Sequence, residues 1–526
     1  MNQYIFGHAH NHLVTVKRII SPLLLILFST SAFAQELFQA FEVDKAAAPR
    51  GGQAILDLFL QTNLRFPLRA EADHVSGRVF VQAIVETDGR LSNVSVLRSL
   101  RPDCDQEALR LIKSFNAWQP AENNGKPVRQ QIAVPVLFKS DIPVYIGTGE
   151  RIDFYASDGS SVQEDATRAI IKRIALVDST GFPTGDITFM EKAGKRWKKV
   201  LTSRYRQTEH ENGPATPYDT IHGFRQIDFI NDRKSIEGNS YGFYKTGELA
   251  FMKPYVRNDI SGSLYFFHPN GVVAERSVYT PTEIEQTFWY PNGQIRAVET
   301  IQRMANKSGR LYTAGLVSQW DSNGRKLVTD GKGTAVYHSW QYNPARKRYT
   351  VFTETGKVDD SRRQGIWKGT SLDGSYTYQE TYQFGEMIDG WAVTTGEDTV
   401  RYTQLEVDPV FGKGQKDLGD FLIKNVRYPV SPGRAGTINV VSKAMVSFLV
   451  NTDGRVSDIE VIGPAAAGLE QEMRRLAKQT GKKWTPGYRR GKPVNMKYTL
   501  PFTFNFRGIV DDTPLAKLPF SQDSEW

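Results

Sequence analysis

Hydrophobic residues in the N-terminal part of the chain follow two different periods in turn. From Leu56 to Leu64 they recur at helical spacing, and the predicted helix should end at Phe66-Pro67, because the residue before a proline avoids the α region. Apolar residues then alternate on either side of a turn within residues 79–96, which predicts a hairpin with one buried face. A second helical stripe and a last strand follow at residues 108–115 and 132–138. The pattern predicts a compact α+β unit of helix, strand, strand, helix and strand.

The same succession returns near the other end of the chain. Its segments reappear in the same order and at nearly constant separation: residues 56–67 as 418–429, Thr87-Asp88-Gly89-Arg90 as 452–455, and Trp118 to Phe138 as Trp484 to Phe504. Small loop insertions explain why the separation grows slightly along the chain. Because chance does not easily give this order and spacing together, we infer an internal duplication of the α+β unit.

The last strand of each copy contains a proline, Pro135 in the first copy and Pro501 in the second. Proline removes a backbone donor from the hydrogen-bond ladder, so both strands should lie at a sheet edge. Such an edge is either protected or accepts an extended peptide from another chain as an added strand. The presence of two copies favours recognition, and the candidate peptide-binding residues are Val136, Leu137, Phe138, Phe502, Thr503 and Phe504.

Between the two copies the composition shifts to aromatic residues, glycine and threonine, with little helical periodicity. Four segments that end in glycine predict β-hairpins in series; they are Tyr244-Lys245-Thr246-Gly247, His268-Pro269-Asn270-Gly271, Tyr290-Pro291-Asn292-Gly293 and Asp321-Ser322-Asn323-Gly324. The aromatic residues beside them are Tyr265, Phe267, Trp289, Tyr290 and Trp320. We interpret these as hydrophobic rungs of the hairpins, with an aromatic surface for peptide or glycan as the alternative.

The two α+β copies resemble the C-terminal domain of the TonB family. Each carries a helix ending in an aromatic residue and proline, a strand running into Thr-Asp-Gly-Arg, a Trp-x-Pro segment, Gly-Lys-Pro-Val and a closing strand. The motif residues are Phe66, Pro67, Asp88, Gly89, Trp118 and Pro120, and Tyr428, Pro429, Asp453, Gly454, Trp484 and Pro486. The hairpin segments, clearest over about residues 240–335, resemble MORN-type repeats of the YwqK-like class.

The resemblance to the TonB family implies a non-enzymatic module that binds the short TonB box of outer-membrane receptors as an added strand. It also implies an energy transducer coupled to an ExbB/ExbD-type motor, if the N-terminus stays in the inner membrane. The chain departs from the family's transducers, because it shows no long proline-rich spacer and only about 20 residues separate Gln35 from Leu56. Peptide binding in the envelope is therefore a firmer expectation than energy transduction.

Taken together, these patterns predict an α+β protein in which two TonB C-terminal-like domains flank an antiparallel β-hairpin repeat array. The expected boundaries are 1–34 for a signal peptide, 45–140 for the first domain, 141–400 for the β-rich region, 404–508 for the second domain and 509–526 for a tail.

The N-terminus has the order of a secretory signal peptide. Lys17-Arg18 precede an apolar run that ends at Phe28, and Ala32-Phe33-Ala34 supply a cleavage site before Gln35. We therefore expect Met1 to Ala34 to be removed and the mature protein to lie in the periplasm or cell envelope. The alternative is an uncleaved anchor in the inner membrane, although the apolar run is shorter than the roughly 20 residues of a membrane span.

Composition narrows the class of protein. A chain of 526 residues with 40% hydrophobic and 23% charged side chains is neither a polytopic membrane protein nor wholly disordered. The net charge of +9 permits contact with anionic polymers without requiring it. The densest basic cluster, Lys482-Lys483 with Arg489, Arg490 and Lys492, is interpreted as a solvated face, with contact to anionic envelope polymers as the alternative. It lies in no nucleic-acid reader motif, so we expect no nucleic-acid partner.

The sequence offers little for catalysis. It contains no phosphate-binding loop, no His-Glu-x-x-His zinc motif and no nucleophile elbow. The single cysteine, Cys104, lies between Asp103 and Asp105, whose carboxylates should raise the thiol pKa and so argue against a nucleophile. Asp88 and Asp453 each precede a glycine, and we interpret them as turn residues. We expect no catalytic residue, cofactor or metal.

The expected function is binding of extended peptide segments of outer-membrane or envelope partners, associated with TonB-dependent transport. The alternative is a periplasmic or surface scaffold in which the hairpin repeats bind the partner and the end domains serve as packing modules.

Overall fold

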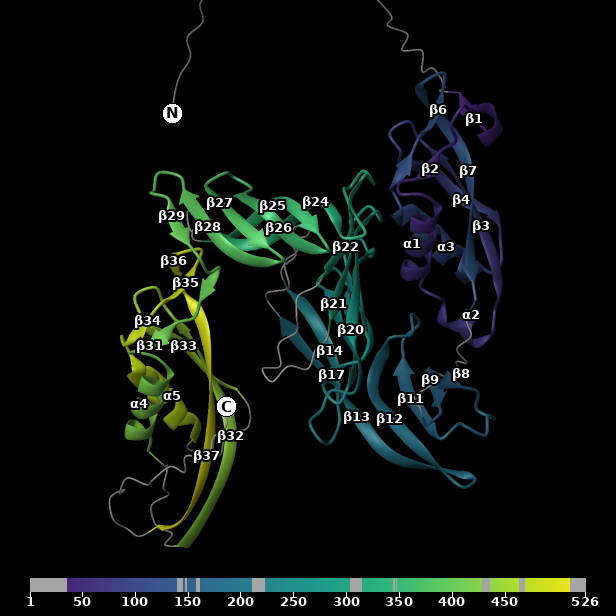
Figure 1. The fold of residues 1–526 in the computed structure, drawn as a ribbon. Helices are drawn as coiled ribbons and strands as arrows, with labels where there is room; N and C mark the ends of the chain where they lie inside the picture. The colour runs from purple at the N-terminus through teal and green to yellow at the C-terminus, as the bar shows by residue number, and fades with distance from the viewer. Residues whose placement is uncertain are drawn as a thin grey trace, which may run out of the picture.

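The structure, a computed structural model, describes residues 36–139, 145–146, 149–157, 161–210, 223–302, 315–343, 346, 348–427, 436–462 and 469–510. These residues form a mixed, mostly β fold, which broadly fits the α+β class that the sequence predicts. Two units that contain helices lie on either side of a long antiparallel sheet (Figure 1). The expected signal segment, the Tyr428-Pro429 motif and residues 511–526 lie outside the described residues.

In the first unit, helices α1 (Gln53–Asn63) and α3 (Pro102–Ser114) pack on a sheet of order β1-β7-β3-β4. Its strands are β1 (Leu37–Phe38), β3 (Gly77–Val85), β4 (Leu91–Arg98) and β7 (Lys126–Phe138). The predicted helices and strands are therefore present. The short elements were not predicted; they are η1 (Ala40–Glu42), α2 (Leu68–Ala72), β2 (Ala48–Pro49), β5 (Trp118–Gln119) and β6 (Ala121–Asn123).

The helical stripes read from the sequence form the core of this unit. Leu56 and Phe59 of α1 and Leu111 of α3 are at most 2% exposed. Alternate residues of β3, among them Val79 and Val81, are fully buried beneath them. Burying such side chains contributes about 1.5–3 kcal/mol each, so the apolar stripes account for the position of both helices.

The second unit repeats this plan. Helices α4 (Gln415–Asn425) and α5 (Leu469–Thr480) accompany a sheet of order β33-β32-β37. Its strands are β32 (Gly436–Val450), β33 (Val456–Ile462) and β37 (Met496–Val510), with short strands β30 (Glu406–Val407), β31 (Val410–Phe411), β34 (Trp484–Thr485), β35 (Gly487–Arg489) and β36 (Lys492–Val494). The β32–β37 ribbon runs from Val450↔Met496 to Gly436↔Val510, so β37 is longer than the strand expected from the first copy, whose predicted residues 132–138 correspond to 498–504.

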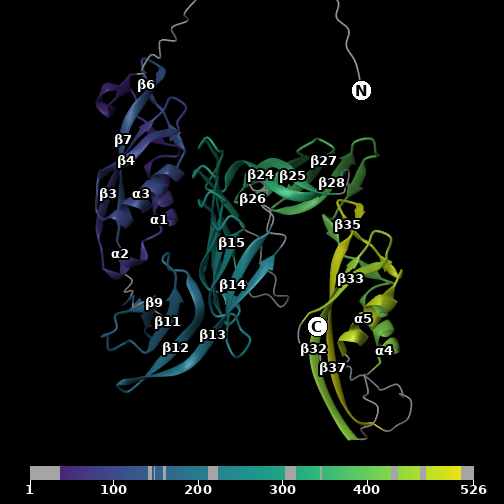
Figure 2. The ribbon, with the colours of Figure 1, turned by 180° about the vertical axis from the view of Figure 1, so that it is seen from behind.

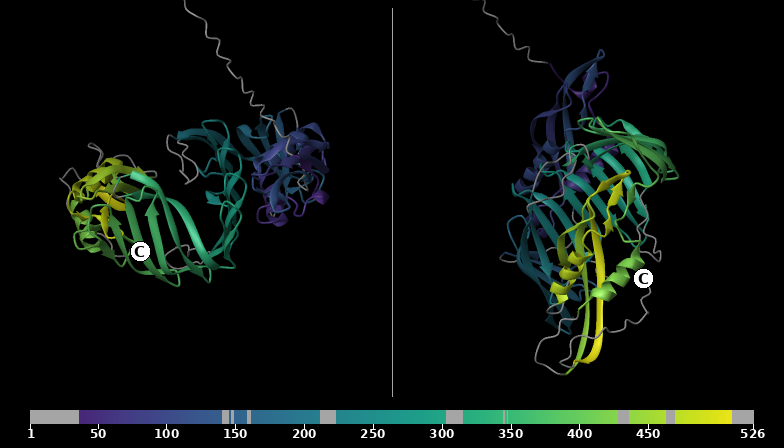
Figure 3. Two further views of the ribbon diagram at one scale, coloured as in Figure 1. Left: turned by 90° about the horizontal axis from the view of Figure 1, so that it is seen from above. Right: turned by 90° about the vertical axis from the view of Figure 1, so that its left-hand side faces the viewer.

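The middle of the chain is a meander in which strands from β11 to β29 pair antiparallel with their neighbours in chain order, and β9 joins it beside β11. Viewed from above, this sheet curves strongly (Figure 3). The strands are β8 (Tyr145–Ile146), β9 (Glu150–Tyr155), β10 (Ser161–Val162), β11 (Ile171–Val177), β12 (Pro183–Ala193), β13 (Arg196–His210), β14 (Phe224–Ile230), β15 (Gly238–Tyr244), β16 (Leu249–Val256), β17 (Asp259–Ile260), β18 (Gly262–Phe267), β19 (Val273–Tyr279), β20 (Glu283–Trp289), β21 (Ile295–Gln302), β22 (Gly315–Trp320), β23 (Lys326–Thr329), β24 (Lys332–Asn343), β25 (Arg348–Asp359), β26 (Arg362–Ser371), β27 (Tyr376–Gln383), β28 (Glu386–Thr394) and β29 (Val400–Tyr402).

The four predicted glycine turns are hairpin turns of this sheet, and we call them the turn ladder (residues 244–247, 268–271, 290–293 and 321–324). In each, the carbonyl of the first residue accepts a hydrogen bond of 2.8–2.9 Å from the glycine N–H, and the glycine has a positive φ of 79–93°. Glycine meets that requirement at no steric cost.

Successive turns of the ladder are tied to each other by their first side chains. The hydroxyl of Tyr244 donates to the carbonyl of Phe267 at 2.6 Å, and that of Tyr290 donates to the carbonyl of Trp320 at 3.1 Å. His268 Nε2 makes the equivalent bond to the carbonyl of Trp289 at 3.0 Å. Each acceptor is the residue that precedes the next turn, so the ladder is a true structural repeat. Trp289 is 1% exposed and the other named aromatic residues are half-buried, as hydrophobic rungs are.

Candidate functional site

The first candidate edge is β7. On one side it pairs with β3 from Val85↔Gln130 to Gly77↔Phe138. On the other side its described pairings are with β6 and with two residues of β1, at residues 126–130. Within the described part of the chain, the outer side of residues 131–138 pairs with no strand. The prediction that the proline-containing strand lies at a sheet edge is confirmed for the greater part of β7.

The side chains of β7 divide between the core and the surface. Val136 and Phe138 are 1% and 0% exposed and belong to the core, whereas Leu137 is 50% exposed. Of the three candidate residues in this strand, only Leu137 presents a side chain outward. Val136 and Phe138 can offer a partner only their backbone groups.

The second candidate edge is β37, which pairs with β32 as the last strand of its sheet. Phe502, Thr503 and Phe504 pair with Ala444, Lys443 and Ser442. Because β32 is the central strand, β37 and β33 are the two edges of this sheet among the described residues. Pro501 therefore lies in an edge strand, as its missing N–H led us to expect.

The Asp-Gly and Trp-x-Pro motifs meet in space. Asp88 caps its own turn, since Oδ1 accepts the N–H of Arg90 at 2.9 Å, and Asp453 accepts that of Arg455 at 3.0 Å. A Cβ on the following glycine, Gly89 or Gly454, would lie 2.3 Å from the carbonyl oxygen of Trp118 or Trp484. The structure thus confirms the turn role of both aspartates and adds a reason for the glycines.

A glutamate–arginine clamp recurs in both units and was missed in the sequence. In the first unit, Arg110 pairs with Glu107 at 2.7 Å and donates to the carbonyl of Asn63 at 2.7 Å, while Glu107 accepts the backbone N–H of Arg65 at 2.6 Å. In the second unit, Arg475, Glu472, Asn425 and Arg427 make the same bonds. The i,i+3 Glu–Arg pair at matching positions of the two copies was the signal available. The clamp fixes the C-terminal end of α1 and of α4.

The first unit docks on the turn ladder through α1 and the end of α3. Asn63 Oδ1 accepts the backbone N–H of Val273 at 2.7 Å, and Arg65 donates to the carbonyl of Gly271 at 3.1 Å. A Cβ on Gly293 would lie 2.8 Å from the ring of Phe59 and 2.9 Å from the ring of Phe115. Trp289 and Val273 belong to the same buried cluster as the helices of this unit. The interface therefore resembles a domain core more than a loose contact.

The second unit meets the other end of the sheet through the turn between β35 and β36, and here the sequence interpretation was wrong. Arg490 is not solvated: its side chain is 12% exposed and pairs with the fully buried Glu380 at 2.6 Å. Its guanidinium lies 3.5 Å from the centre of the Tyr378 ring and donates to Gln341 at 2.8 Å. Lys492, 13% exposed, pairs with Glu397. The acidic partners of Arg490 and Lys492 belong to the middle sheet and are distant in sequence, which explains the error. Lys482 and Lys483 are exposed, as expected.

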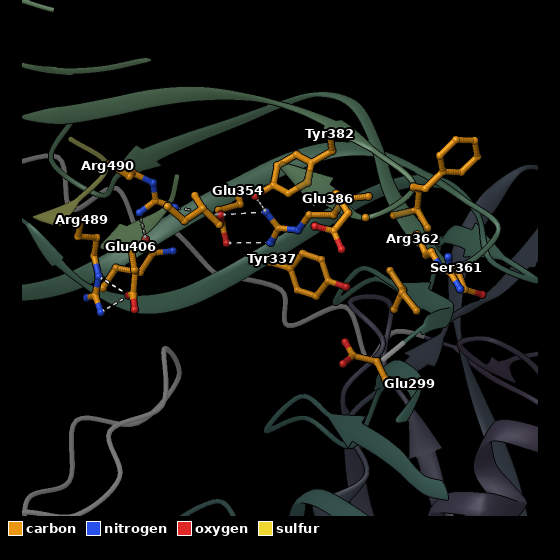
Figure 4. A pocket seen from close by; sticks show the side chains of 17 residues that line it. Glu299, Tyr337, Glu354, Ser361, Arg362, Tyr382, Glu386, Glu406, Arg489 and Arg490 are labelled. Carbon is orange, nitrogen blue, oxygen red and sulfur yellow. Dashed lines mark hydrogen bonds and ion pairs between the residues drawn. The ribbon is translucent and has the colours of Figure 1, made fainter. Parts of the chain in front are cut away.

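A cavity of about 740 Å³ lies between the middle sheet and this turn. Figure 4 shows Arg489 and Arg490 at one end of it and Ser361 and Arg362 at the other, with Glu354, Tyr337 and Tyr382 between them.

Two carboxyl groups that line the cavity have pKa values shifted in opposite directions. Burial raises the pKa of Glu299. Burial alone would also raise the pKa of Glu354, but the guanidinium of Arg363 and the hydroxyl of Tyr378 hold it below its ordinary value. Glu354 therefore remains paired with Arg363, at 3.4 Å, inside the cavity.

Cys104 is buried in the first turn of α3. Burial, and secondarily the carboxylate of Asp103, raise the pKa of its thiol to about 11. The thiol is thus protonated at neutral pH, as the sequence predicted, and is unsuited to act as a nucleophile.

No helix among the described residues is long and apolar enough to cross a membrane.

Comparison with known proteins assigns the two units but not the middle sheet. The family model of the Gram-negative bacterial TonB protein C-terminal matches residues 62–140 and 426–506. Among curated proteins, none matches the chain. The two matched segments end in β7 and β37, the two strands considered above. Two segments of the chain, one on either side of the middle sheet, therefore match the TonB C-terminal family, and each makes up most of one unit.

Proposed function

We propose that this chain is a non-enzymatic protein of the cell envelope that binds extended peptide segments of outer-membrane partners by strand addition at β7 and β37, and that it takes part in TonB-dependent transport. One observation carries the proposal: both segments that match the TonB C-terminal family close with a strand whose proline-containing part is paired on one side only among the described residues. An edge strand offers a row of backbone donors and acceptors that an extended peptide can pair with.

The two edges differ in what they offer besides the backbone. At β7 the outward side chain of Leu137 is 50% exposed and adds apolar contact to the backbone pairing. At β37 the ribbon with β32 is longer, so more residues of a peptide can pair along it. Both edges belong to units anchored to the middle sheet, which sets the distance between them. Coupling to an ExbB/ExbD-type motor is part of the proposal only for a chain that keeps its N-terminus.

The test uses the full mature chain and a peptide that carries the TonB box, with binding measured by isothermal titration calorimetry. A second peptide of the same sequence, with backbone amides N-methylated at every other residue, cannot donate to an edge strand and should bind at least tenfold more weakly. Equal binding of the two peptides, or no binding of either, would sink the proposal.

A pair of variants locates the binding at β7. Leu137→Asp changes the proposed edge, and Leu97→Asp makes the same change on β4, at the opposite edge of the same sheet, where Leu97 is 57% exposed. The first variant should weaken binding to the first unit several-fold, and the second should leave it unchanged.

The cavity favours a second candidate, a scaffold in which the middle sheet holds the partner. Its lining of tyrosines, arginines and carboxylates suits a polar ligand better than an extended apolar strand. This candidate predicts that Tyr337→Ala abolishes partner capture and that N-methylation of the peptide has no effect.

A further inference from the structure

The two TonB C-terminal-like domains have equivalent helix faces, but among the described residues only the face of the first domain is covered by the chain's own sheet. In the first domain the face formed by Phe59, Asn63 and Arg65 is covered by the turn ladder of the chain's own sheet. Figures 1 and 2 show α1 on the side of its domain that faces the sheet, whereas α4 lies on the side of its domain away from it. We call the equivalent residues of the second domain the α4 face; they are Phe421, Asn425 and Arg427.

The α4 face is held in the same geometry as its counterpart. Asn425 Nδ2 donates to the carbonyl of Phe421 at 2.7 Å, as Asn63 Nδ2 donates to the carbonyl of Phe59 at 3.0 Å. With Nδ2 fixed in this way and the backbone held by the Glu–Arg clamp, the amide of Asn425 is oriented like that of Asn63. Its Oδ1 is thereby pre-positioned to accept a backbone N–H.

Within the described part of the chain, however, that acceptor is unused. Asn63 is 4% exposed and its Oδ1 accepts the N–H of Val273, whereas Asn425 is half-buried and its Oδ1 accepts no hydrogen bond. Phe59 is fully buried, whereas Phe421 is half-buried. Arg427 is exposed.

Two sequence differences between the copies define what would fit. Thr480 stands where the first domain has Phe115, so only one ring, that of Phe421, would face a docked turn. Lys483 stands where the first domain has Ala117, and its ammonium lies 4.6 Å from the centre of the Phe421 ring. Lys482 and Arg427 are also exposed. A docked turn would meet cations, so a carboxylate beside the turn complements the face.

We propose that the α4 face is a docking site for an acidic β-hairpin tip on another polypeptide, held as the first domain holds the tips of the turn ladder. A backbone N–H just after the turn would donate to Asn425 Oδ1, a turn carbonyl would accept from Arg427, and a carboxylate would pair with Lys483. In Figure 1, α4 and β37 lie on opposite sides of the second unit, so this proposal and strand addition at β37 can fail independently of each other.

The probe is a disulfide-cyclised peptide of residues 238–256, the β15–β16 hairpin. Its tip follows the ladder pattern and carries Glu248 directly after the turn glycine. Binding to the full mature chain is measured by fluorescence anisotropy. A photoreactive residue in place of Lys245 should cross-link to residues 418–427.

Variants of the α4 face decide the outcome. Asn425→Ala and Arg427→Glu should each lower the affinity at least fivefold, the loss expected for one hydrogen bond or ion contact. Lys416→Glu makes the same charge change at an exposed residue of the first turn of α4 and should have no effect. Equal thermal unfolding midpoints of the variants confirm that the domain still folds, and Glu248→Gln in the peptide should weaken binding as well.

Cross-links elsewhere, absence of binding, or affinities unchanged by Asn425→Ala and Arg427→Glu would overturn the proposal. Concentration-dependent self-association of the full chain that is abolished by Arg427→Glu would support it and would identify the hairpin as that of a second copy.

Discussion

Arg490 holds the second unit on the middle sheet, and its removal should release that domain. The side chain is 12% exposed, pairs with a glutamate that is fully buried, and lies over the ring of Tyr378. Removing one partner of a buried ion pair costs about 3–5 kcal/mol, because the remaining charge is left without compensation. Since 1.4 kcal/mol is a factor of ten, Arg490→Ala should lower the ratio of docked to undocked domains by about a hundred- to several-thousand-fold.

Arg489 supplies the matched control, because it neighbours Arg490 but pairs with Glu406 at the surface, where the two side chains are 38% and 53% exposed. Exposed pairs contribute about 0–1 kcal/mol, so Arg489→Ala should leave the domain docked. Arg490→Lys keeps the charge but loses the planar fork, and should fall between the two.

Docking is measured by energy transfer between dyes on cysteines at Leu372, which is 78% exposed, and Thr452, which is exposed in the turn after β32. Cys104 is buried and stays unlabelled. A fall in transfer efficiency for Arg490→Ala and none for Arg489→Ala is expected. Equal transfer for both variants and the parent would refute the reasoning that this buried pair holds the domain.

Three further predictions concern the first domain and the ion pairs of the sheet. Gly293→Ala should destabilise the fold by about 2–5 kcal/mol in chemical denaturation, because a side chain at positive φ costs about 1–2 kcal/mol and the new Cβ would also collide with Phe59 and Phe115. Gly247→Ala is the control: its φ is similar, but no atom lies within 4 Å of the new Cβ, so only the cost of the positive φ should appear. Because Glu354 has a lowered pKa in the folded protein, the stability it contributes is fully present above its unfolded pKa of about 4.3 and should be lost as the pH falls through its folded value. When the free energy of unfolding is measured against falling pH, Glu354→Gln should therefore lose less stability than the parent, and an equal loss would contradict the assignment. Cys104, with a thiol pKa of about 11 and no exposed surface, should react with a thiol reagent at pH 8 only as fast as the domain unfolds, and a rapid reaction of the folded chain would contradict its burial.

Local periodicity was sufficient to predict much of the two end domains. One core decides which residues of α1, α3 and β3 are apolar, so their spacing predicts these elements. Because the pattern is duplicated, the second copy could be predicted in the same way. The glycine turns were predictable for the same reason, since a positive φ at Gly271 or Gly293 restricts the residue locally.

Contacts between distant segments could not be read in this way. Arg490 is separated by 110 residues from the glutamate it pairs with, and Asn63 by 210 residues from the N–H that it accepts. The same basic sequence can lie on a solvated surface or enter a site lined with carboxylates and tyrosines. Which of the two occurs depends on residues of the middle sheet, far away in the sequence. The outward direction of Leu137 and the inward direction of Val136 and Phe138 followed from the register of β7 on β3, which the strand pattern alone left open.

The most direct test of strand addition is amide hydrogen exchange of the full mature chain with and without a peptide that carries the TonB box. Strand addition predicts new protection on the outer-facing amides of Val136 to Phe138 or Phe502 to Phe504, and none on β4 or β33 at the opposite edges. Binding that leaves both strands unprotected, or that protects the cavity between the middle sheet and the β35–β36 turn instead, would contradict the proposed function.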